Sequence, residues 1–154
     1  MKRLDVISNL AYLVVAFLVE PLLVKLSIAA LAFASGLYHY TYTRRALTLD
    51  RWAMYMVAYS VVHVAQQWPL WVVGVAVVVM YVLALKMRSD RVVPALYGIV
   101  IGVKAAWLPL GIFLLALAFG QRGESYTLGS KAYGVWHALW HVTTAIGILM
   151  LSAT

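Results

Sequence analysis

The chain has 154 residues, of which 65% are hydrophobic and only 11% are charged, and its mean hydropathy is +0.91. A soluble domain carries about 25% charged residues, so the composition excludes that class and predicts an integral membrane protein with one domain over residues 1–154. The formal net charge is +7, but the basic residues stand in short breaks between apolar runs, where Lys and Arg orient membrane proteins, so nucleic acid is not an expected partner. The absence of cysteine excludes disulfides and thiolate metal ligands.

The first apolar segment runs from Leu4 to Val19. Bulky residues and Pro21 follow it where a signal peptide would carry a small-residue cleavage site, so we expect a retained membrane span. The second segment runs from Leu22 to about Tyr42 and ends before Arg44 and Arg45. Its last turns are rich in tyrosine, which is typical of a helix end at the membrane surface.

The third predicted helix begins at Asp50, with Thr48 or Asp50 itself as the N-cap residue. It ends in a tight turn before Pro69, because proline favours the first turn of a new helix. The fourth helix continues to Leu85, and the charged stretch 86–91 then forms a loop. These two segments complete the first four predicted spans.

The range Val92 to Gly120 is too long for one span and short for two, and it contains Lys104 and Pro109. It forms either a hairpin of two short helices or a single kinked helix. If this range forms two spans, every Lys and Arg except Lys25 and Lys104 lies on the same side of the membrane as the N-terminus. If it forms one span, the basic residues are divided less unevenly between the two sides. The positive-inside rule then predicts seven helices in the cell membrane, with the N-terminus cytoplasmic and the C-terminus outside.

The last segment, Lys131 to Ser152, spans roughly 33 Å as a helix, which matches the hydrocarbon core of a bilayer. It contains His137 and His141, which lie four residues apart and therefore on one face of the helix. Two such imidazoles either bind one metal ion or hydrogen-bond to neighbouring helices near the headgroups. Polar groups at this depth are costly, so the pair is a candidate functional site.

Other polar residues are predicted to lie at the same membrane surface. Ser35 and His39 are four apart late in the second helix, and Asp50 begins the third. Seven helices bring the start of the last helix, with His137, to this cytoplasmic side, whereas six helices send His137 towards the opposite face. The charge asymmetry and the assembly of a site therefore require the same topology.

Three imidazoles, from His39, His137 and His141, match the ligand count of a catalytic zinc site that keeps its fourth position for water. Zinc lowers the pKa of bound water to about 7. We choose Asp50 as the proton acceptor, although an acid at a helix start also serves as a cap. Ser35, one turn before His39, is placed to hydrogen-bond to the water or to a substrate oxyanion, although small polar residues also tighten helix packing.

Asp50 is chosen among the five acidic residues partly by elimination. Asp5 lies at the N-terminus, and Glu20 is on the opposite side of the membrane. Asp90 and Glu124 are in predicted loops. Asp50 is thus the one acid expected near the histidines.

The pattern Ser35-x-x-x-His39, then Asp50, then His137-x-x-x-His141 resembles the signature of the CREST superfamily of membrane hydrolases. That superfamily joins the alkaline ceramidases to the progestin and adiponectin receptors. The interval between His39 and Asp50, and a Ser-Asn dipeptide at positions 8 and 9 in the first helix, most resemble the alkaline ceramidase branch.

The resemblance implies a seven-helix fold that binds Zn²⁺ through the three histidines, with Asp50 and Ser35 acting on a zinc-bound water and the substrate carbonyl. The implied reaction is ceramidase-like hydrolysis of an amide or ester of a membrane lipid. The alternative is a seven-helix lipid-binding or receptor-like protein with a structural zinc. A retinal protein is disfavoured because the last helix has no internal lysine, and bis-histidine haem because its ligands come from opposed helices. The oligomeric state is not predicted.

Overall fold

The computed structural model describes residues 2–67 and 107–153, with positions 69, 71, 72, 75, 78, 79 and 82 between them. This part of the chain is helical and contains no strand, which confirms the all-α prediction for it. Its helices are α1 (Lys2–Ser8), α2 (Leu10–Leu18), α3 (Leu22–Thr41), α4 (Arg44–Gln66), α7 (Trp107–Glu124) and α8 (Lys131–Ser152). Most of the predicted fourth span, and the part of the range 92–120 before Trp107, lie outside the described residues.

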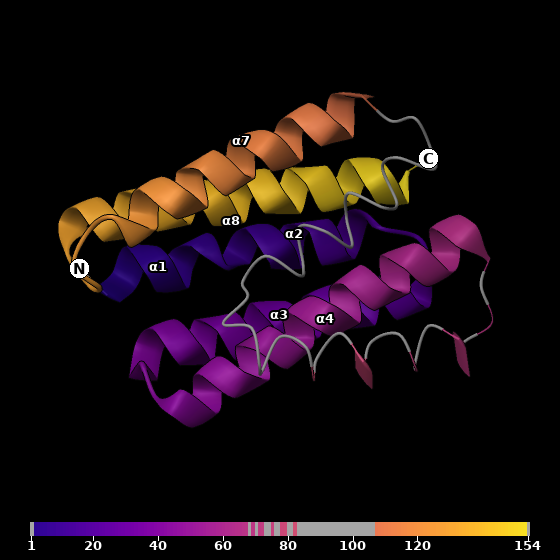
Figure 1. Ribbon diagram of the computed structural model, residues 1–154, viewed down its shortest axis with the longest axis horizontal. Helices are drawn as coiled ribbons and strands as arrows, with labels where there is room; N and C mark the ends of the chain where they lie inside the picture. Colours follow the sequence, from indigo (N-terminus) through magenta and orange to yellow (C-terminus); the bar gives the residue numbers. More distant parts are fainter. Residues whose placement is uncertain are drawn as a thin grey trace.

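The helices form a bundle in which the first and last ones run side by side (Figure 1). Helices α1 and α2 pack against both α8 and α3, α4 pairs antiparallel with α3, and α7 pairs antiparallel with α8. The N-terminus, the α3–α4 turn and the start of α8 lie at one end of the bundle, shown at the left of Figure 1. The predicted meeting of the second and last helices at a common end is therefore confirmed.

Among the residues that the structure describes, two helices, Leu22–Thr41 and Lys131–Ser152, are long and apolar enough to cross a membrane. They coincide with the predicted second and last spans, and the last one has the predicted bounds. The first apolar segment, Leu4–Leu18, is shorter than these two helices. A turn at Asn9 divides it between α1 and α2.

The predicted start of the third helix was wrong. Helix α4 begins at Arg44, and its N-cap is Thr43, whose Oγ1 accepts a hydrogen bond from the backbone N of Ala46 at 3.3 Å. Neither Thr48 nor Asp50 caps the helix; Asp50 lies well inside it and is buried. The residues between the cap and Asp50 include good helix formers, so the helix extends back to the first side chain able to cap it.

Helix α7 contains the described end of the ambiguous range and continues to Glu124, and Pro109 is its third described residue. The following turn contains Gly129 at φ 77°, a left-handed conformation that glycine adopts readily. A Cβ atom at Gly120 would lie 3.5 Å from the ring of Trp140. Gly120 of α7 thus packs against the half of α8 that carries the histidines.

The apolar core lies between α2, α3, α4 and α8 and includes the fully buried Ile28, Val57 and Ile148. One polar contact crosses this core, because the Oγ atoms of Ser27 on α3 and Ser60 on α4 lie 2.7 Å apart. Each hydroxyl also lies 2.9 Å from a backbone carbonyl of its own helix. The core therefore holds α3 and α4 together beside α8.

Candidate metal centre

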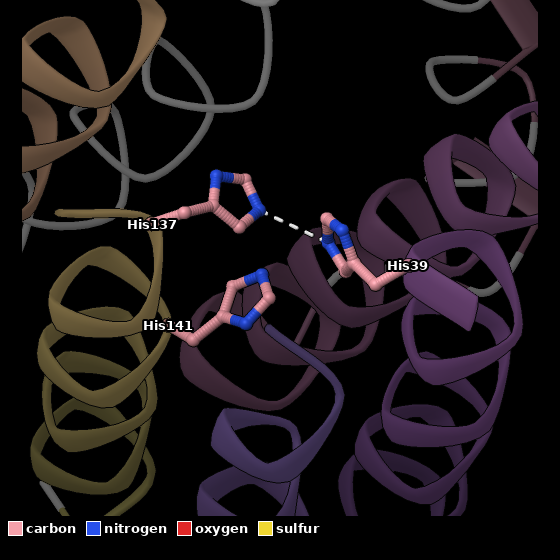
Figure 2. A group of neighbouring side chains, drawn as sticks. All are labelled: His39, His137 and His141. Atoms are coloured by element: carbon pink, nitrogen blue, oxygen red, sulfur yellow. Dashed lines mark hydrogen bonds between the residues drawn. The ribbon is translucent and has the colours of Figure 1, made fainter. Parts of the chain in front are cut away.

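Three histidine rings converge at the end of the bundle where α3 ends and α8 begins (Figure 2). His39 extends from α3, and His137 and His141 extend from successive turns of α8. One ring nitrogen from each lies within 4.8 Å of the others. The three residues predicted as metal ligands are therefore close enough together to hold one ion.

Two of the ring nitrogens lie within hydrogen-bond distance of each other, and their separation is also close to that of two ligands on one transition-metal ion. The Nε2 atoms of His39 and His137 are 3.0 Å apart. Two nitrogens bound to a tetrahedral zinc ion at 2.0–2.1 Å stand about 3.3 Å from each other, so a small opening of the rings accommodates the ion. Imidazole nitrogens suit Zn, Cu, Fe and Ni, and three of them leave a coordination position open.

The centre is buried and walled by aromatic rings. His39 is 1% exposed and His141 is 2% exposed. Tyr133 stacks on His137 at 4.9 Å with an interplanar angle of 17°, and the ring centroid of Trp140 also lies 4.9 Å from that of His137. Trp140 therefore packs against the histidines.

The predicted catalytic residues lie at the same end of the bundle. Ser35 is buried one turn before His39 on α3, and Asp50 is buried in the early part of α4. In the part of the chain that the structure describes, the close group of ligand atoms comprises imidazoles and no carboxylate. Asp50 is thus positioned outside the cluster rather than as a fourth ligand.

A second carboxyl group, not selected from the sequence, is buried beside the centre. Asp5 is 1% exposed, and its Oδ2 accepts a hydrogen bond of 2.7 Å from the phenol of Tyr42. Its Oδ1 lies 2.7 Å from where a Cβ atom of Gly134 would stand, one turn before His137 on α8. The phenol donates and the carboxyl oxygen accepts, so Tyr42 satisfies one of the two oxygens of this buried acid.

Ser8 was also missed as a functional residue, because the sequence offered it only as half of a dipeptide. Its Oγ lies 2.8 Å from Nδ1 of His141. A signal was present, since Asp5, Ser8 and Asn9 are spaced i, i+3 and i+4 in an otherwise apolar segment and so share one helix face. Polar residues on one face of an apolar helix indicate a polar partner within the bundle.

Comparison of the sequence with protein-family models and with curated proteins gave no match. The likeness to the CREST signature therefore depends on the site residues themselves.

Proposed function

We propose that this chain is an intramembrane zinc-dependent hydrolase that cleaves an amide or ester bond of a lipid, as the CREST superfamily and its alkaline ceramidase branch do. The observation that supports it most is the convergence of three imidazoles within 4.8 Å in an apolar helical bundle. Buried polar groups of this kind are costly, and a shared metal ion is a physical reason to keep three together.

His39, His137 and His141 would hold the ion. Zinc held there would supply a Lewis acid, which polarises a carbonyl oxygen and makes water more acidic. The aromatic walls around the imidazoles limit the access of bulk water, and this strengthens every electrostatic interaction inside.

Two buried residues take the remaining roles. Asp50 accepts the proton of the attacking water and passes it to the leaving amine or alcohol as the acyl bond breaks. The hydroxyl of Ser35 donates a hydrogen bond to the substrate carbonyl oxygen, on which negative charge develops. The burial of both side chains, late in α3 and early in α4, supports these assignments.

The outer surface of the bundle suits a bilayer. Large apolar side chains on α2 and α3 face outward, including Phe17 at 82% exposure and Phe33 at 75%. Water would make such surfaces an aggregation hazard, whereas lipid covers them without cost. This supports a multi-pass membrane domain, which we assign seven helices with the N-terminus in the cytoplasm and the C-terminus outside. A lipid is then the substrate class with direct access.

A receptor-like protein with a structural metal is the second candidate. It is favoured by the near-complete burial of His39 and His141, since structural metal sites are closed. Lipid would then be bound without being cleaved.

Lipid turnover by purified, zinc-loaded protein distinguishes the hydrolase from the receptor-like protein. Native protein should release fatty acid from a mixture of amide and ester lipids, and Asp50→Asn should lose most of this activity while keeping its zinc. Asp50→Asn activity equal to native would exclude Asp50 as the base. Zinc binding without turnover of any lipid by native protein would favour the receptor-like function.

A further inference from the structure

The first helix changes its hydrogen bonding at the junction between α1 and α2. In a regular α-helix the backbone N of Asn9 would donate to the carbonyl oxygen of Asp5, but here it donates to that of Val6, at 3.2 Å. The Asp5 carbonyl instead accepts two side-chain bonds, from Ser8 Oγ at 2.8 Å and from Asn9 Nδ2 at 2.8 Å. The turn at Asn9 therefore makes the Asp5 carbonyl a fixed acceptor for Ser8.

This arrangement assigns the hydrogen of the Ser8 hydroxyl. A hydroxyl has one hydrogen, and a carbonyl oxygen only accepts, so the hydrogen of Ser8 points to Asp5. The same Oγ lies 2.8 Å from Nδ1 of His141, and it meets that nitrogen with a lone pair. Nδ1 of His141 must then be the donor and carry the ring hydrogen.

We propose that Ser8 is a positioning residue that holds His141 in the tautomer with hydrogen on Nδ1 and thereby leaves Nε2 free to bind a transition-metal cation. This inference rests on the metal centre of the proposed function. Metal-binding histidines usually donate their other nitrogen to such a partner, which fixes both the tautomer and the ring orientation.

His141 differs from His39 in this respect. The Nδ1 atom of His39 is buried and has no hydrogen-bond partner among the described residues. Ser8 and His141 are both buried, at 8% and 2% exposure, so water competes little with their bond. Tyr12, one turn after Ser8, places its ring centroid 5.5 Å from that of His141 and limits how far the imidazole turns. The orientation of His141 is thus set by a hydrogen bond at Nδ1 that His39 lacks.

The first test measures zinc affinity by competition with a chelator. Ser8→Ala should bind zinc about 10- to 100-fold more weakly than native protein, the usual cost of losing such a partner. Ser8→Thr keeps the hydroxyl and should retain most of the affinity. The matched control is Ser27→Ala, which removes another buried serine bonded to a carbonyl and a side chain but touches no histidine; its affinity should equal the native value.

The second test reads the tautomer directly. Nitrogen NMR of ¹⁵N-histidine-labelled native protein, with His141 assigned by loss of its signals in His141→Asn, should show a protonated Nδ1 before and after zinc is added. This measurement needs only native protein and the assignment variant, so it stands even where Ser8→Ala fails to fold.

The outcomes distinguish this inference from the proposed function. A native protein that binds no zinc overturns both. A native protein that binds zinc, with Ser8→Ala as tight as Ser27→Ala or with an unprotonated Nδ1 on His141, overturns the role of Ser8 alone. Loss of affinity in Ser8→Ala together with rescue in Ser8→Thr supports it, whichever lipid the protein acts on.

Discussion

The Nε2 atom of His39 lies 3.0 Å from that of His137, although 98 residues separate the two in the chain. The contact joins α3 to α8, and the third ring, that of His141, lies 4.5 Å from His137 and 5.2 Å from His39 between centroids. Packing alone rarely brings three imidazoles together in this way, two of them buried and one partly buried, because each brings polar nitrogens that need partners. A shared cation would satisfy a nitrogen on each ring at once.

The first prediction concerns metal content. Purified native protein should carry about one zinc per chain, and His39→Ala, His137→Ala and His141→Ala should each carry far less, because three protein ligands define such a site. The control is His63→Ala, which removes the fourth histidine, on α4, outside the cluster. Elemental analysis after dialysis measures the content. Equal zinc in all four variants would exclude this centre.

The triad could be predicted from sequence because its determinants are local and periodic. The pair on α8 follows from a spacing of four residues, and the apolar lengths of α3 and α8 set where each helix begins and ends. The prediction of seven helices rather than six then placed the start of the last helix, with His137, at the same end of the bundle as His39. None of these steps needed knowledge of how side chains pack.

The burial of Asp5 was not predicted from the sequence, and the predicted start of the third helix at Asp50 was wrong. Burial of Asp5 depends on α1 packing against α8 and on a phenol from the α3–α4 turn, contacts between segments far apart in the chain. The start of α4 depended on whether Thr43 or a later residue caps the helix, and several capping residues compete in that stretch. Tertiary contacts and competing caps are not encoded in local periodicity.

A second prediction tests the close approach of α1 to α8. Gly134→Ala would place a Cβ atom 2.7 Å from Asp5 Oδ1, and Asp5 cannot easily move because Tyr42 holds its other oxygen. We expect a loss of about 1–3 kcal/mol of stability from this overpacking. Gly36→Ala is the matched control on α3, where nothing lies within 4 Å, and it should be neutral or stabilise by up to about 1 kcal/mol. Unfolding in detergent compares them, and equal stabilities would contradict the predicted contact.

A third prediction concerns the bond between Tyr42 and Asp5. Tyr42→Phe removes the donor to a buried carboxyl oxygen, which should cost about 1–3 kcal/mol. Tyr40→Phe, at an exposed tyrosine two residues earlier, should cost little. In the Asp5→Ala background, which removes the acceptor, the cost of Tyr42→Phe should shrink, because the two residues act as a pair. Additive losses in the double variant would show that the pair is not coupled.

A fourth prediction tests whether α8 crosses the membrane. The sequence contains no cysteine, so a cysteine introduced by mutation is the one thiol that can be labelled. Ser125 and Ala153 are exposed at opposite ends of α8, in the turn before it and just after its last residue. The turn is flanked by Arg122 and Lys131, so the positive-inside rule places it in the cytoplasm. A membrane-impermeant maleimide should therefore label Ser125→Cys in inverted vesicles and Ala153→Cys in right-side-out vesicles. Labelling of both variants from the same side would mean that α8 does not cross the bilayer, which would contradict the multi-pass topology proposed around the buried metal centre.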